Sequence, residues 1–170
     1  MLAMHTSGEL KSGAVRGGTE GRVRSDLMAW VSAKSSGPGM KSFIGCVDRF
    51  IMQLAEEVEE LKQGGRMLMR TDAMASVYPG NGAHYIRHID NNTKNGRVLT
   101  TLLYLNPMWE PSDGGCFKLF LKKGDVVIEP IFNRFLVFWS DSRCPHEVLP
   151  AHSLRYAMSI WYNDSAEILA

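Results

Sequence analysis

One long segment of the chain repeats apolar residues at the spacing of a single helix face. Between about Lys41 and Gln63 they recur every three or four positions, which is the period of an amphipathic helix. The residues on this face are Phe43, Ile44, Val47, Phe50, Ile51, Leu54, Val58 and Leu61. A Gly-Gly pair follows as a stop signal. The pattern therefore predicts one helix that supports the rest of the fold.

From residue 74 onward the pattern changes to short apolar runs separated by Gly, Pro, Asn or Asp at most of the breaks. Such runs are typical of strands joined by turns. The seven runs are 74–78, 83–89, 97–105, 116–121, 126–129, 134–139 and 154–162. Seven short strands without an internal repeat favour an all-β sandwich or barrel. We expect a mostly β jelly roll flanked by the helix.

The N-terminal part shows neither period. Residues 1–26 are rich in Gly, Ser and Arg, which predicts a mobile loop or a weak hairpin. The apolar run Leu27–Val31 that follows is a plausible strand. We therefore divide one domain into an N-terminal loop and edge-strand region (1–40), a supporting helix (41–65) and the jelly roll (66–170).

Composition places the chain among ordinary globular proteins. It has 170 residues, of which 45% are hydrophobic and 22% charged, and a formal net charge of +1. This balance gives no electrostatic reason to expect nucleic acid or an anionic membrane as partner, and we expect a monomer. The first residues lack the basic and then apolar pattern of a secretory signal, and the three cysteines are widely spaced, so we expect a reducing compartment, the cytoplasm or the nucleus.

The candidate chemistry begins with His88-Ile89-Asp90 at the end of a strand-like run. On a strand, residues two apart point to the same face, so His88 and Asp90 can converge on one point. His146 lies beyond a later run and could complete the set, because a jelly roll brings distant strands together. Two histidines and one carboxylate are the ligand set of non-haem Fe(II) oxygenases. Taken singly, each histidine is more often a surface or packed residue than a ligand.

Arg155 follows His146 by nine residues, within the apolar run 154–162. Alternation puts Arg155, Ala157, Ser159 and Trp161 on one face of that run. If this face points inward, the guanidinium needs an anionic partner, either a protein carboxylate or a bound dicarboxylate gripped by two hydrogen bonds. The alternative is an outward-facing, solvated arginine.

The chain resembles the hypoxia-inducible-factor prolyl hydroxylases. The resemblance spans nearly everything from Met74 to Asp164 and includes Arg87-His88-Ile89-Asp90-Asn91, Pro145-His146-Glu147-Val148 and Arg155-Tyr156-Ala157. Further matching segments are Tyr78-Pro79-Gly80-Asn81-Gly82, Tyr104-Leu105-Asn106, Gly114-Gly115, Ile128-Glu129-Pro130 and Phe138-Trp139-Ser140-Asp141. The chain is similar to a protist or divergent member shortened at both ends, since the strand and helix that usually precede the mobile loop are largely absent.

This resemblance implies a double-stranded β-helix core and a peptidyl-proline 4-dioxygenase that depends on Fe(II) and 2-oxoglutarate. It uses O2, releases succinate and CO2, and takes L-ascorbate as reductant. By resemblance, iron is held by His88, Asp90 and His146, and the co-substrate by Arg155, Tyr104, Tyr78 and Ser159. The substrate, a protein or peptide containing proline, is contacted by Trp161, Arg97, Arg24 and Asp26.

Two rival functions remain open from the sequence. One is a 2-oxoglutarate dioxygenase acting on another substrate class. The other is a non-catalytic peptide-binding module that keeps the jelly roll. The complete set of three metal-ligand candidates and Arg155 argues against the second, and product analysis on candidate peptides separates all three.

Overall fold

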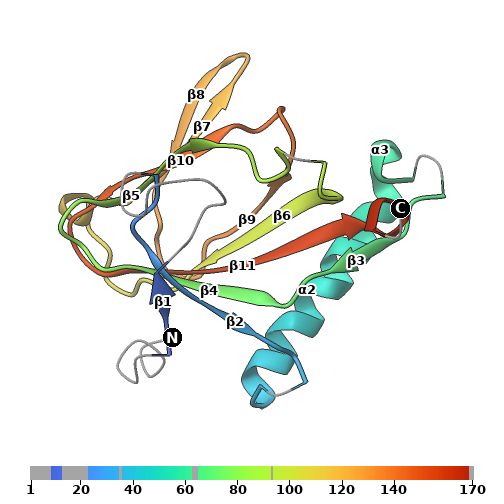
Figure 1. The fold of residues 1–170 in the computed structure, drawn as a ribbon, viewed down its shortest axis with the longest axis horizontal. Coiled ribbons are helices and arrows are strands. Elements are labelled where there is room, and N and C mark those ends of the chain that lie inside the picture. Colours follow the sequence, from blue (N-terminus) through green and yellow to red (C-terminus); the bar gives the residue numbers. More distant parts are fainter. Residues whose placement is uncertain (1–8, 13–22, 35, 63–64, 93, 169–170) are drawn as a thin grey trace.

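Two antiparallel sheets face each other across a cavity, and one long helix covers the outer side of the larger sheet (Figure 1). The computed structural model describes residues 9–12, 23–34, 36–62, 65–92 and 94–168. The mobile loop expected before residue 26 falls largely on residues 13–22, outside the described residues. None of the helices in the described part of the chain is long and apolar enough to cross a membrane.

The larger sheet has the strand order β1-β2-β4-β11-β6-β9, and β3 pairs with the far end of β11. Its strands are β1 (Lys11–Ser12), β2 (Leu27–Val31), β3 (Leu68–Arg70), β4 (Ala73–Tyr78), β6 (Arg97–Tyr104), β9 (Phe135–Trp139) and β11 (Arg155–Asp164). The strand predicted after the N-terminal region is confirmed as β2. All pairings in this sheet are antiparallel.

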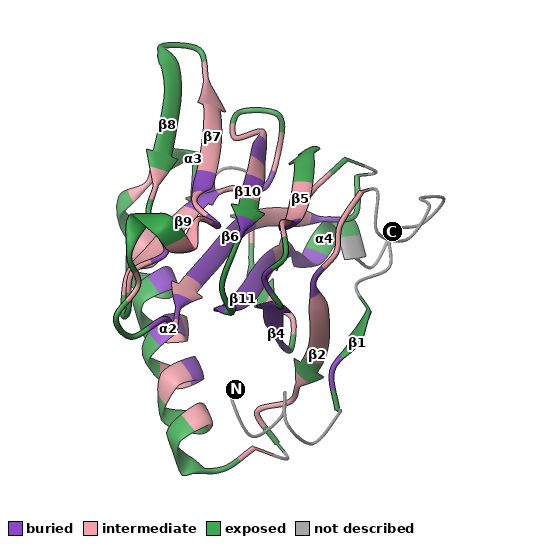
Figure 2. Cartoon of the chain, turned by 90° about the vertical axis from the view of Figure 1, so that its left-hand side faces the viewer, coloured by how far each residue is buried: buried purple, intermediate pink, exposed green. Residues whose placement is uncertain are grey.

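The smaller sheet has the strand order β5-β10-β7-β8. Its strands are β5 (Ala83–His88), β7 (Phe117–Leu121), β8 (Gly124–Ile128) and β10 (His146–Ala151). The β7–β8 hairpin projects from the body of the fold, and β8 is exposed along most of its length (Figure 2). Two facing antiparallel sheets in this order are consistent with the expected jelly-roll core.

The supporting helix is confirmed, although its boundaries differ from the prediction. It begins earlier, as α2 (Pro38–Glu57), because a proline suits the first position of a helix. It also ends earlier: Val58 turns to an extended conformation while its N–H still donates to the Leu54 carbonyl. A separate turn, α3 (Glu59–Lys62), then buries Leu61 in the core. The periodic pattern continues across this break and conceals it.

Strand β11 is buried on both faces, and its alternation is as predicted. Met158, Ile160 and Tyr162 pack with the apolar face of α2. Arg155 and Ser159 on the other face line the cavity between the sheets. This single strand therefore separates the main hydrophobic core from the site.

Three strands were missing from the prediction. β1 is only two residues long. β3 is only three residues long, too short to show a period. β10 contains Pro150, which argues against a central strand. The proline is tolerated because β7 pairs with β10 only over His146–Val148, so Pro150 lies past that ladder. In the described part of the chain, the remaining helices are a 3₁₀ turn (Pro111–Asp113) and α4 (Ser165–Ile168).

Candidate metal centre

Antiparallel pairing of β5 and β10 brings the two candidate histidines together. His88 is directly opposite His146 in the register, and their ring centroids lie 4.2 Å apart. Asp90 lies two residues beyond His88, just past the end of β5. The structure therefore brings together side chains that are separated by more than 50 positions in the sequence.

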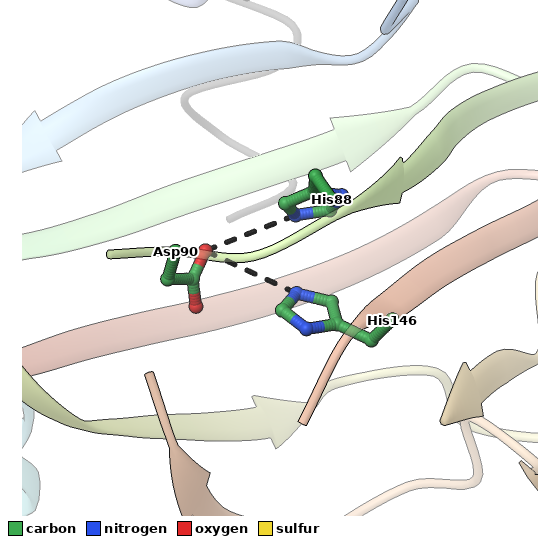
Figure 3. A group of neighbouring side chains, drawn as sticks. All are labelled: His88, Asp90 and His146. Carbon is green, nitrogen blue, oxygen red and sulfur yellow. Dashed lines mark ion pairs between the residues drawn. The ribbon is translucent and has the colours of Figure 1, made fainter. Parts of the chain in front are cut away.

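Figure 3 shows the carboxylate of Asp90 facing both imidazoles. Its Oδ1 lies 3.8 Å from Nε2 of His88 and 3.9 Å from Nε2 of His146. One ligand atom from each residue lies within 4.8 Å of the others. Nitrogen and oxygen donors in this set suit a divalent transition metal such as Fe(II).

Backbone carbonyls orient both rings. Nδ1 of His88 lies 2.8 Å from the Ile86 carbonyl, and Nδ1 of His146 lies 2.9 Å from the Cys144 carbonyl. A carbonyl can only accept, so in each neutral ring Nδ1 carries the proton and Nε2 keeps a free lone pair. Both lone pairs are therefore available to an ion between the three side chains.

The electrostatics favour the metal-binding forms of these groups. Burial and the neighbouring His146 lower the pKa of His88 to about 4. Burial alone would raise the pKa of Asp90, but His146, His88 and a hydrogen bond from Thr100 bring it below its ordinary value. At neutral pH, His88 is neutral and Asp90 is ionised, as metal binding requires.

Aromatic rings enclose the histidines. The ring of Tyr85 stacks on His88 with centroids 3.6 Å apart and planes inclined by 14°. Phe117 and Phe138 contact His146, with centroids 4.9 and 5.0 Å away. These contacts limit rotation of both imidazoles and keep their surroundings apolar.

Strand alternation does not predict that Tyr85 reaches the site. On a regular strand, residues three apart point to opposite faces, so Tyr85 should point away from His88. The register with β10 shifts between these two residues, because three positions of β5 are matched to two of β10. This β-bulge restores Tyr85 to the face of His88. No sequence signal marks the bulge.

Next to the candidate ligands lies a cavity of about 430 Å³, lined by both sheets. Arg155 lines it and is only 3% exposed, which excludes the solvated alternative. Its Nε donates to the Gly115 carbonyl at 2.6 Å, and its guanidinium lies against the rings of Tyr78 and Tyr104. Gly115 has a positive φ of 69°, and a Cβ there would lie 2.7 Å from Cδ of Arg155. A glycine is therefore required beside this side chain.

Two polar atoms at this end of the cavity have no hydrogen-bond partner among the described residues: Nη2 of Arg155 and the hydroxyl of Tyr104. Burial raises the pKa of Tyr104 to about 12 and also raises the pKa of Tyr78, so both hydroxyls remain donors at neutral pH. Ser159 also lines the cavity. Because buried donors are normally satisfied, this end of the cavity fits an anionic ligand.

Four further residues were predicted to contact substrate, and the structure places three of them in the cavity lining. Trp161, Arg97 and Arg24 line the cavity, and the Arg97 guanidinium lies 4.3 Å from the Trp161 ring centroid. The cavity lining does not include Asp26. Its carboxylate is buried behind Arg24 and accepts two hydrogen bonds from it, at 2.6 and 2.5 Å. Arg24 in turn lies over the ring of Tyr85, 4.6 Å from its centroid.

Replacing Asp26 by Asn is expected to lower the free energy of unfolding by about 3–5 kcal/mol, because it leaves the buried Arg24 charge without its anionic partner. Urea denaturation measures this change. The matched control is Asp141→Asn: Asp141 also accepts paired hydrogen bonds from an arginine, but both side chains are at least 40% exposed. Its loss should cost less than about 1 kcal/mol. Equal losses in the two variants would show that burial adds nothing to the Asp26 pair.

Comparison with known proteins decides the family. The sequence model of the 2OG-Fe(II) oxygenase superfamily matches residues 73–163, more than half of the chain. This stretch contains His88, Asp90, His146 and Arg155. The chain belongs to the 2OG-Fe(II) oxygenase superfamily.

Several relatives of this oxygenase are prolyl hydroxylases. It is 36% identical to prolyl hydroxylase EGLN3 of Homo sapiens over 96% of its own chain and 70% of that protein. It superposes on a Trichoplax adhaerens prolyl hydroxylase, solved in complex with a hypoxia-inducible-factor peptide fragment, with a TM-score of 0.89 and 41% identity, covering 99% and 76% of the two chains. It also superposes on a Pseudomonas putida prolyl-4-hydroxylase with a TM-score of 0.80 and 28% identity, covering 95% of this chain and 81% of that one. The resemblance and the jelly-roll core expected from the sequence are confirmed.

The residues of this oxygenase fit both groups in the family's name. Two imidazole nitrogens and a carboxylate oxygen converge as Fe(II) ligands, and the unpartnered donors of Arg155 and Tyr104 fit a carboxylate of 2-oxoglutarate. When bound, these groups supply the reduction of O2, coupled to conversion of 2-oxoglutarate to succinate and CO2. Ascorbate is a typical reductant for prolyl hydroxylases.

Proposed function

We propose that this oxygenase hydroxylates a prolyl residue of a protein substrate, as a peptidyl-proline 4-dioxygenase that releases succinate and CO2. The observation that carries the proposal is the likeness, over 99% of the chain, to a prolyl hydroxylase in complex with a hypoxia-inducible-factor peptide fragment. The three convergent metal-ligand candidates and the unpartnered Arg155 donor support a catalytic rather than a purely binding role.

In this proposal the chain's own residues bind, orient and exclude water. Arg155 fixes the far carboxylate of 2-oxoglutarate through its free Nη2, and Tyr104 donates a further hydrogen bond. Leu102 and Phe138 contribute apolar surface to the cavity, which limits the access of water to the reacting atoms. These residues position the reactants, and the metal performs the oxidation.

The cavity opening supports a peptide containing proline as substrate. Trp30 is 49% exposed, and its ring lies 5.8 Å from that of Trp161 between ring centroids. Trp30 offers exposed flat apolar surface to the ring of a proline, and the adjoining Trp161 ring, only 6% exposed, backs it from the cavity wall. Arg97 lies over Trp161 and donates to the Asp90 carbonyl at 3.3 Å, which connects this aromatic surface to the candidate metal centre.

Incubation with Fe(II), 2-oxoglutarate and ascorbate tests the proposal. We expect succinate formation to rise when a library of proline-containing peptides, including a hypoxia-inducible-factor peptide, is added. Mass spectrometry should find one added oxygen atom on a proline, and the same peptide with that proline replaced by Ala should give only the basal succinate. Oxygen added to a different residue type would support the rival substrate class. A complete lack of 2-oxoglutarate turnover would support the non-catalytic module.

We also propose that the enzyme acts as a monomer in the cytoplasm or nucleus, without a nucleic-acid or membrane partner. The net charge of +1 supports the absence of a nucleic-acid or membrane partner, since it provides no general attraction to polyanions. The three cysteines are free thiols, in keeping with a reducing compartment. Light scattering and cell fractionation test these two proposals, and a stable dimer or a secreted form would contradict them.

A further inference from the structure

The two carboxylate oxygens of Asp90 have different surroundings. Oδ1 faces Nε2 of both His88 and His146. Oδ2 accepts a hydrogen bond of 2.6 Å from the hydroxyl of Thr100. Asp90 lies past the end of β5, so the ladder that holds His88 does not fix it. Something other than strand pairing must determine which oxygen faces the ion.

Thr100 is itself held by a second hydroxyl. It lies in β6, is 3% exposed, and its Oγ1 is 2.8 Å from Oγ of Ser140, which is 1% exposed. A carboxylate can only accept, so the Thr100 proton points to Asp90. Ser140 must therefore donate to Thr100, which gives a directed chain from Ser140 through Thr100 to Asp90.

Ser140 also fixes the backbone next to the carboxylate. It directly follows β9, and its N–H donates to the Val98 carbonyl at 2.9 Å. Its own carbonyl accepts the N–H of Asn91 at 2.8 Å. The larger sheet thus holds both the side chain of Asp90 and the peptide that follows it, while the smaller sheet carries the two histidines.

We propose that Thr100 and Ser140 are positioning residues for the metal centre. They hold the Asp90 carboxylate so that Oδ1 is presented to the ion and Oδ2 is withheld from it. A hydrogen bond to an ionised acceptor is stronger than a neutral one, and both hydroxyls are buried, so the preference is maintained without competition from water. Partners of metal ligands typically contribute 10–100-fold to metal affinity.

The neighbouring residue in the same strand provides a matched control. Thr101 is 1% exposed and donates to the Ile160 carbonyl at 3.0 Å, but by alternation it points to the opposite face of the sheet. Thr101→Val therefore removes a buried threonine hydroxyl and its hydrogen bond without touching Asp90. A role limited to stability predicts similar behaviour of Thr100→Val and Thr101→Val.

The test measures Mn(II) binding to the full chain by electron paramagnetic resonance, with thermal unfolding of each variant in parallel. We expect Thr100→Val to weaken Mn(II) about 10–100-fold, Ser140→Ala to weaken it less, and Thr100→Ser to restore affinity. Thr101→Val should bind Mn(II) like the unaltered protein even if its Tm falls. The Co(II) absorption spectrum should change in Thr100→Val, because a released carboxylate can bind through both oxygens.

Two results would overturn this proposal. One is unchanged Mn(II) affinity in a folded Thr100→Val protein, and the other is an equal loss of affinity in Thr101→Val. If Thr100→Val does not fold, Ser140→Ala and Thr100→Ser give the same comparison, with weakened and restored affinity as the expected pair. The experiment needs metal alone, so its outcome is independent of the substrate that the enzyme hydroxylates.

Discussion

Asp90→Ala is expected to abolish turnover while leaving the fold nearly intact. Asp90 supplies the only carboxylate in the cluster of three ligand candidates, and its removal leaves just two imidazole ligands, which bind Fe(II) weakly. His146→Ala should have the same effect. Succinate production measures turnover, and far-ultraviolet circular dichroism and Tm report the fold. A change to a residue that only supports a ligand should cost less, typically 10–100-fold.

Asp125→Ala is the control for the Asp90 variant. Asp125 lies on the exposed β7–β8 hairpin, where it pairs with Lys118 and its side chain is 46% exposed. We expect this variant to keep full activity. Full activity of Asp90→Ala in metal-depleted and reloaded protein would instead refute the assignment of Asp90 as a ligand.

Arg155→Ala should weaken 2-oxoglutarate much more than it weakens the metal. The guanidinium is buried, and its Nη2 has no partner among the described residues, so its removal takes away a charged donor that is free to bind a carboxylate. Loss of a buried hydrogen-bonded charge pair costs roughly 2–5 kcal/mol, about 30- to 5000-fold in affinity. Calorimetric titration of the Mn(II)-loaded proteins with 2-oxoglutarate measures the two affinities and hence their ratio.

Two companion variants separate charge from packing. Arg155→Lys keeps the charge but loses the planar pair of donors, and we expect an intermediate affinity. Arg143→Ala removes an arginine whose side chain is 47% exposed on the surface, and it should bind 2-oxoglutarate normally. If the affinity of Arg155→Ala equals that of Arg143→Ala, the guanidinium does not contact the co-substrate.

The fold elements that could be predicted are those with a clear period. Alternation along β11 correctly placed Arg155 and Ser159 on one face and Met158 on the other, and the structure turns the first face to the cavity and the second to the core under α2. The helix was recognised from its apolar face. Its break at Val58 was not, because only the backbone conformation of that residue changes and the hydrophobic spacing continues through it. β10 was missed because Pro150 suppressed the strand signal, and only the pairing with β5 and β7 makes it a strand.

The sequence predicts the candidate site only where residue type and the alternation of side chains along a strand are sufficient. The short spacing of His88 and Asp90 places them together, while His146 needed the topology of the sheets to join them. Tyr85 depends on a bulge, and the hydrogen bonds of Thr100 depend on how the two sheets approach each other. Such contacts join segments that no local pattern relates. Asp26 illustrates the reverse case, since a residue expected at the substrate surface is buried behind Arg24.

The segment before β2 also bears on where the working unit of this enzyme begins. Residues 23–25 pair with the outer edge of β5: Ser25 donates to the His84 carbonyl, and Ile86 donates to the Val23 carbonyl. The family match starts only at residue 73, yet the strand that ends in His88 depends on this earlier piece of chain for one of its two edges. A shortened protein that starts at β2 would expose that edge to self-association. Designers of minimal versions of the enzyme should therefore retain the chain from at least Val23.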